Sequence, residues 1–117
     1  MYILEKEFLI DCAHQLKDSE SLTTKKCLNL HGHTYRIIIK IESPKLIDGM
    51  VIDFGKLKEI VDELDHQNLN DKMRDNPTAE NMAKYLWDNI DALMGPRDSK
   101  TYITVYETPT SKVTFTL

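Results

Sequence analysis

The chain has 117 residues, of which 41% are hydrophobic, and a formal net charge of −4. This length predicts one domain over residues 1–117, and the acidic balance without a basic stripe argues against a nucleic-acid binder. No apolar run is long enough to cross a membrane and the first residues lack the features of a secretory signal, so we expect a cytoplasmic protein with free cysteine thiols.

The first elements expected along the chain are two strands, over residues 2–10 and 31–42. A polar loop joins them, and it is long enough to be functional. Residues 44–49 then form a turn, followed by a short extended piece at 50–52. These assignments leave the first half of the chain mostly extended.

Two helices are expected next. Asp53 is placed to cap the first helix, whose apolar stripe runs to a helix end near Asp65. Asn76-Pro77 is typical of a helix start, and Gly95-Pro96 of a helix end. The chain finishes with two further strands, over residues 101–107 and 112–117. The predicted fold is therefore α+β, with the order β-β-α-α-β-β, a four-stranded antiparallel sheet and two helices on one face.

A metal site is predicted at the start of the second strand. Side chains alternate along a strand, so His31 and His33 point to one face, in phase with Tyr35 and the isoleucines that follow. Buried imidazoles need partners, and His14, just after the first strand, supplies a third nitrogen. Neutral imidazoles suit Zn²⁺, and three protein ligands leave a position open for a substrate.

Cys27 lies four residues before His31, and its thiol has two interpretations. As a fourth ligand it would close the metal shell and make the site structural. Outside the shell, a thiolate beside the metal could remove a proton from a bound substrate.

Two acidic positions are further candidates. Asp65-His66 comes at the end of the first helix, where the carboxylate can fix the imidazole tautomer or simply serve as a capping feature. Glu107 shares a strand face with Ile103 and Val105, so its carboxylate needs a cation or hydrogen-bond donors. Either an internal basic partner or a ligand with paired N–H donors, such as a guanine-like or pterin ring, would satisfy it.

Five motifs in this order resemble the 6-pyruvoyl-tetrahydropterin synthase and 6-carboxy-tetrahydropterin synthase family. The motifs are Cys27-x-x-x-His31-Gly32-His33-Thr34-Tyr35, Val51-Ile52-Asp53-Phe54, Leu64-Asp65-His66-Gln67-Asn68-Leu69-Asn70, Pro77-Thr78-Ala79-Glu80-Asn81 and Val105-Tyr106-Glu107-Thr108. The resemblance implies the tunnelling fold, in which β-β-α-α-β-β subunits form a barrel as trimers and two trimers stack into a hexamer. It also implies roles for individual residues: zinc ligands His14, His31 and His33, the base Cys27, proton transfer by Asp65 and His66, pterin binding by Glu107 and a weaker contact from Thr78.

The spacing of three residues between Cys27 and His31 resembles the bacterial 6-carboxy-tetrahydropterin synthases of queuosine biosynthesis. The implied reaction converts 7,8-dihydroneopterin triphosphate to 6-carboxy-5,6,7,8-tetrahydropterin, acetaldehyde and triphosphate. The alternatives are an enzyme of the same fold that makes the 6-pyruvoyl product or only cleaves the side chain, and a zinc-stabilised binding module without activity.

Overall fold

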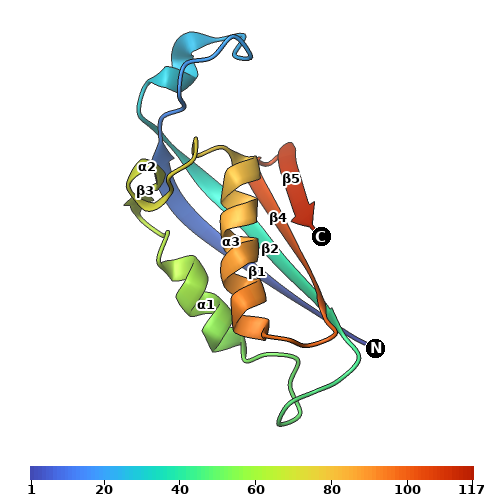
Figure 1. Ribbon diagram of the computed structural model, residues 1–117. Helices are drawn as coiled ribbons and strands as arrows, with labels where there is room; N and C mark the ends of the chain where they lie inside the picture. The colour runs from blue at the N-terminus through green and yellow to red at the C-terminus, as the bar shows by residue number, and fades with distance from the viewer.

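A computed structural model describes residues 1–117. Its sheet is built on two long antiparallel strands, β1 (Tyr2–His14) and β2 (His31–Ser43). β4 (Lys100–Thr108) pairs with β2, and β5 (Ser111–Thr116) pairs with β4, both antiparallel. A short strand, β3 (Gln67–Asn68), runs parallel to β1 and gives the sheet order β3-β1-β2-β4-β5. Figure 1 shows these strands crossing behind the helices.

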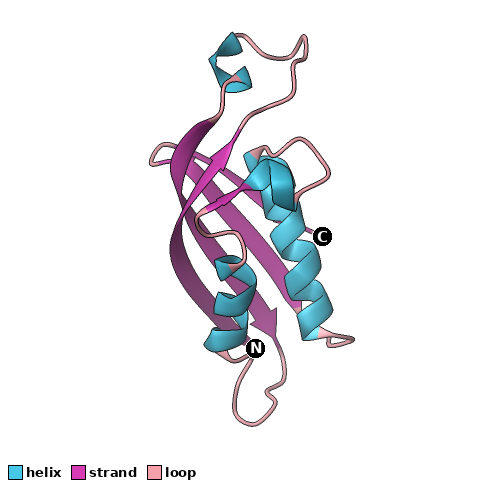
Figure 2. Cartoon of the chain, turned by 90° about the vertical axis from the view of Figure 1, so that its left-hand side faces the viewer, coloured by secondary structure: helices cyan, strands magenta, loops and turns pink.

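The helices cover one face of this sheet (Figure 2). α1 (Phe54–Asp62) and α3 (Ala79–Met94) are the two long helices, and α2 (Leu69–Lys72) is a single turn after β3. A 3₁₀ turn, η1 (Lys25–Leu28), interrupts the loop between β1 and β2. This arrangement confirms the predicted α+β class with the helices on one face. None of the helices combines the length and apolar character that a membrane crossing requires.

The core lies between α3 and the covered face of the sheet. Ile37, Ile39 and Ile41 alternate along β2 and are fully buried, opposite residues of β4 that include Ile103 and Val105. Full burial of such a side chain is worth about 1.5–3 kcal/mol. Because His31 and His33 continue the same alternation, the packing that fixes the isoleucines also aims both imidazoles at the helix-covered side.

The sheet has five strands, so the predicted four-stranded antiparallel sheet is wrong by one strand. β3 pairs with β1 at Cys12 and Ala13, and this pairing requires β1 to run beyond residue 10 to His14. The alternation of buried and more exposed side chains does continue through this stretch, with Cys12 and His14 buried. The polar Asp11 is tolerated inside the strand because it lies on the uncovered face and accepts a hydrogen bond from Thr34 Oγ1 at 2.5 Å.

The helix boundaries also differ from those expected. α1 ends at Asp62, because the chain continues in single i→i+3 turns that lead to Asp65. α3 begins after Thr78, whose hydroxyl accepts the Asn81 N–H at 3.2 Å, so Thr78 and not Asn76 is the N-cap. The predicted stop is confirmed: Gly95 has φ 68°, a conformation that favours glycine, and ends the helix.

Candidate metal centre and pterin site

Three histidines meet at the end of β1 and the start of β2. The strand register places His14 directly opposite His31, and His33 opposite Cys12, all on the helix-covered face. One nitrogen of each imidazole lies within 4.8 Å of the other two. The structure therefore brings together the three residues that the sequence predicts as metal ligands, with His14 as the last residue of β1.

Backbone carbonyls decide which ring nitrogen of two histidines carries the proton. His14 Nδ1 lies 2.7 Å from the Pro77 carbonyl oxygen, and His31 Nδ1 lies 2.7 Å from the Asn29 carbonyl oxygen. A carbonyl oxygen can only accept, so both Nδ1 atoms must donate. In the neutral rings the two Nε2 atoms then carry lone pairs, and these atoms face each other at 3.0 Å. Two opposed lone pairs at this distance require a positive charge between or beside them.

The third imidazole also lacks a partner that a positive ion could supply. His33 Nε2 is buried and has no hydrogen-bond partner. Burial lowers the pKa of His14, which favours the neutral ring that metals bind. Three imidazoles whose nitrogens converge in a partly buried site fit a divalent ion such as Zn²⁺.

The two carbonyls that orient these rings were not predicted from the sequence. A metal-bound histidine usually donates its other N–H to a carbonyl or a carboxylate. Nothing in the residue types of Pro77 and Asn29 marks them for this role, because any residue offers a carbonyl. The Tyr35 hydroxyl also lies 3.2 Å from His14 Nδ1. The only feature of the sequence that indicated this contact is that Tyr35 falls on the same strand face as His33.

The two cysteines occupy different environments. Cys12 is buried and donates its S–H to the Leu64 carbonyl at 3.1 Å, and burial raises the pKa of this thiol to about 12. Cys27 is half-buried in η1, and its carbonyl accepts the Leu16 N–H at 2.8 Å. The group of converging ligand atoms contains the three histidines and neither cysteine. This arrangement favours Cys27 as a group outside the metal shell.

Glu107 lies next to the histidines on β4. Its Oε1 is 3.6 Å from His33 Nε2, beyond hydrogen-bond length, and about a third of the side chain is exposed. Val105, two residues earlier, pairs with Ile37 on the covered face, and the β4–β5 register shifts between Tyr106 and Thr108. The 3.6 Å distance to His33 places the Glu107 carboxylate on the side of the histidines. Neither an arginine nor a lysine forms an ion pair with this carboxylate. The geometry therefore leaves Glu107 available for donors of a bound molecule.

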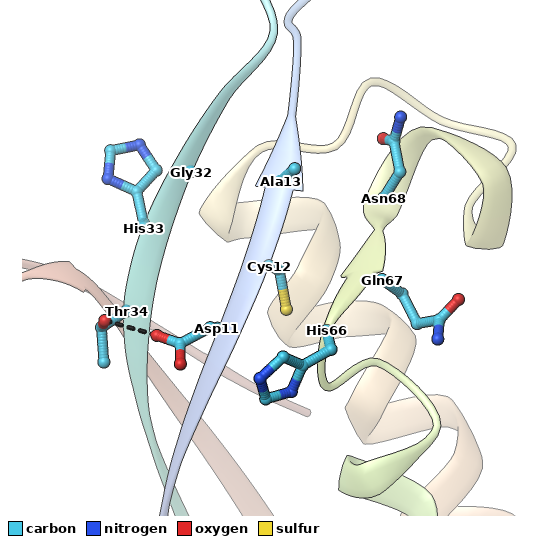
Figure 3. A pocket seen from close by; sticks show the side chains of 9 residues that line it. All are labelled: Asp11, Cys12, Ala13, Gly32, His33, Thr34, His66, Gln67 and Asn68. Carbon is cyan, nitrogen blue, oxygen red and sulfur yellow. Dashed lines mark hydrogen bonds between the residues drawn. The ribbon is translucent and has the colours of Figure 1, made fainter.

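The Asp65-His66 pair is attached to the other side of β1. Asp65 Oδ1 accepts the Asp11 N–H at 3.0 Å and lies 3.0 Å from His66 Nδ1, so the carboxylate orients the ring. The Asp11 hydrogen bond is the main reason that the pKa of Asp65 is lowered. His66 has φ 60° and an exposed side chain. In Figure 3, β1 and β2 separate this ring from that of His33, although both line one surface pocket.

Thr78 has a structural task in the subunit. Its hydroxyl caps α3, and the preceding residue, Pro77, supplies the carbonyl that orients His14. Thr78 thus lies one residue from the carbonyl that orients His14, and it does not belong to the group of candidate ligands.

Comparison with known proteins places this geometry in a family. Residues 3–117 match the family model described as 6-pyruvoyl tetrahydropterin synthase. A dihydroneopterin monophosphate aldolase of Pyrococcus furiosus is 43% identical over 84 residues, covering 68% of this chain and 67% of that protein. A 6-carboxy-5,6,7,8-tetrahydropterin synthase of Haemophilus influenzae is 33% identical over 141 residues, covering 95% of this chain and 96% of that protein.

A solved structure agrees with these matches. The 6-pyruvoyl tetrahydropterin synthase of Caenorhabditis elegans superimposes with a TM-score of 0.74 at 28% identity, covering 99% of this chain and 95% of that one. The fold and the nearly full-length family match lead to the same conclusion: this chain belongs to the 6-pyruvoyl tetrahydropterin synthase family.

Proposed function

We propose that this protein is a zinc-dependent 6-carboxy-5,6,7,8-tetrahydropterin synthase that acts on 7,8-dihydroneopterin triphosphate. The observation that carries the proposal is the set of three converging imidazole nitrogens beside the carboxylate of Glu107, which has no lysine or arginine partner and lies 3.6 Å from His33 Nε2. A metal site with an adjacent acceptor for paired N–H donors suits a pterin whose side chain carries hydroxyl groups. The three-residue spacer between Cys27 and His31 supports the carboxy branch and a place in queuosine biosynthesis.

The proposed reaction begins with loss of a proton from the substrate side chain. Zinc held by His14, His31 and His33 would supply Lewis acidity that makes a C–H next to a side-chain oxygen more acidic. Cys27 removes that proton as the general base. Glu107 holds the ring by accepting its N–H donors.

Asp65 and His66 form a second proton-transfer group in this proposal. The carboxylate accepts the Nδ1–H of His66 and leaves Nε2 free to take or give a proton. Because the strands separate this ring from the histidine cluster within one subunit, we propose that the pair acts in an assembled oligomer.

The uncovered face of the sheet supports assembly into a barrel with a water-lined wall. This face exposes Ile3 and Leu9 but is otherwise mostly polar. It carries cations stacked on aromatic rings, with Arg36 4.8 Å from the centre of the Tyr106 ring and Lys40 5.0 Å from that of Tyr102. Single subunits would leave this face and the sheet edges unpartnered. A hexamer of two trimers would satisfy them.

A second candidate is aldol cleavage without further conversion. The relative from Pyrococcus furiosus, named as an aldolase, shares 43% identity with this chain over the aligned residues. The same base and the same metal site would serve a reaction that splits the side chain and stops at a hydroxymethyl pterin.

Product analysis tests the proposal. The zinc-loaded protein is incubated separately with 7,8-dihydroneopterin triphosphate and with the monophosphate, and all products are identified by mass. The synthase predicts 6-carboxytetrahydropterin, acetaldehyde and triphosphate. A 6-hydroxymethyl pterin with a phosphorylated two-carbon aldehyde would establish the aldolase, and a 6-pyruvoyl product would establish the other synthase. Consumption of neither substrate would favour the binding module.

A further inference from the structure

The loop that carries Cys27 has no hydrophobic anchor. Residues 15–30 leave the sheet after one metal ligand, His14, and return at another, His31, and none of these loop residues is buried. In Figure 1 the loop projects beyond the end of the sheet. A loop without a fully buried side chain depends strongly on its hydrogen bonds, so the position of Cys27 depends on which groups make them.

A backbone hydrogen bond couples the two legs of the loop at Cys27 itself, in addition to the exposed Lys25–Asp18 ion pair farther from the sheet. The Leu16 N–H donates to the Cys27 carbonyl at 2.8 Å. The placement of Cys27 therefore follows the placement of Leu16 in the outgoing leg, and whatever fixes that leg also fixes the thiol.

Two asparagines fix the outgoing leg on its opposite side. The Asn70 side chain accepts the Gln15 N–H and donates to the Gln15 carbonyl, each at 2.9 Å. This reciprocal pair continues the β1-β3 pairing beyond the last paired strand residues. Asn76 Oδ1 accepts the Lys17 N–H at 2.9 Å. The two amides thus hold the residues directly before and after Leu16.

The asparagines are themselves held in place. The Asn70 N–H donates to Asn68 Oδ1 at 3.0 Å, which caps α2, and the Asn81 side chain donates to the Asn76 carbonyl at 2.8 Å. Each asparagine therefore connects the loop, which has no buried residue, to a packed segment next to the helices.

We propose that Asn70 and Asn76 are positioning residues that hold Cys27 in place for proton removal, acting through Leu16. This inference rests on the proposed function, in which Cys27 is the base. A base must lie within hydrogen-bond reach of the proton it removes, and misplacement by about 1 Å can cost a factor of about 10² in rate. Neither asparagine would contact the substrate or the metal in this role.

Asn70→Ala and Asn76→Ala test the clamp, with Asn89→Ala as a matched control. Asn89 donates its side-chain N–H to the Tyr85 carbonyl at 2.8 Å on the exposed side of α3, far from the loop. For each zinc-loaded variant we would measure zinc content, kcat and KM with 7,8-dihydroneopterin triphosphate, and the rate of alkylation by iodoacetamide. Mass spectrometry identifies which cysteine is alkylated. Cys27 is the one expected to react, because Cys12 is buried.

The clamp predicts that both loop variants keep their zinc, that kcat falls about 10- to 100-fold with little change in KM, and that Cys27 alkylation accelerates at least about threefold. The control should match the parent. Unchanged kcat and unchanged alkylation in both loop variants would overturn the clamp, as would a loss of activity that follows loss of zinc. If Asn70→Ala fails to fold, Asn76→Ala carries the same test.

The outcome also separates the clamp from the proposed function. Faster Cys27 alkylation with unchanged turnover would support the clamp and contradict the assignment of Cys27 as the base. If the parent protein turns over no pterin, the alkylation rates alone decide whether Asn70 and Asn76 hold the loop.

Discussion

Glu107→Gln is the substitution that tests how the pterin ring is recognised. The change keeps the size and shape of the side chain but replaces one acceptor oxygen by an N–H₂ donor and removes the charge. Paired N–H donors of a ring would then meet one acceptor and one donor. His33, whose Nε2 lies 3.6 Å from the carboxylate, keeps its position because the strand register is unaffected.

The expected loss follows from the environment of this carboxylate. Leaving a buried donor without its acceptor costs about 1–3 kcal/mol, and more for a charged pair. About a third of the Glu107 side chain is exposed, so water compensates in part and we use the lower half of this range. A loss of about 1–2 kcal/mol weakens binding by a factor of about 5–30.

Calorimetric titration with a pterin product analogue measures this loss. Glu59→Gln, which changes an exposed glutamate on α1, is the matched control and should bind like the parent. Zinc content and oligomer size should be the same in all three proteins. Unaltered affinity in a folded, zinc-loaded Glu107→Gln protein would refute the reasoning, because the ring would then be recognised elsewhere.

Four further variants test the remaining groups. Cys27→Ala should keep its zinc and its fold but lose product formation by at least about 10²-fold, whereas loss of zinc on metal analysis would make the thiol a ligand. A double His31→Ala, His33→Ala variant should purify without zinc, and full occupancy would contradict the site. Thr78→Ala should lower the free energy of unfolding by about 1 kcal/mol in urea titrations, and an unchanged midpoint would show that the cap contributes nothing. The Asp65 pKa is lowered from its ordinary value of 3.8, so the carboxylate stabilises the fold above pH 3.8, and this contribution disappears as the pH falls through the folded pKa. Below pH 3.8 the melting temperature of the parent should therefore fall more steeply with decreasing pH than that of Asp65→Asn. An equal fall in both proteins would contradict this.

Much of the site could be predicted because it follows the period of a strand. The alternation along β2 places His31 and His33 with the buried isoleucines. The phase of Glu107 with Val105 predicts the side on which its carboxylate meets His33, although the β4–β5 register shifts at this residue. A period of two needs no tertiary information. The prediction of a metal site depended on this phase and on the chemistry of imidazole.

The rest of the fold depends on contacts between distant segments. His66 adopts φ 60° just before β3, where the chain turns onto β1. Although histidine is enriched among the non-glycine residues with positive φ, the conformation is uncommon even for histidine, so the sequence alone did not predict this turn. Asn76 and Thr78 are both suitable N-caps for α3. Thr78 takes this role because the Asn76 side chain instead accepts the Lys17 N–H. The orientation of His14 by Pro77 likewise joins residues far apart in the chain, through a carbonyl that every residue carries.

A zinc titration of the metal-free protein tests whether a metal bound by the three histidines drives the reaction. Zinc is added in steps to the apo-protein with excess 7,8-dihydroneopterin triphosphate, and the initial rate of acetaldehyde release is measured at each step. We expect the rate to rise linearly and to reach a plateau at one zinc per chain, with no such rise in the His31→Ala, His33→Ala variant. Acetaldehyde release that is independent of zinc, or no release at one zinc per chain, would contradict this expectation.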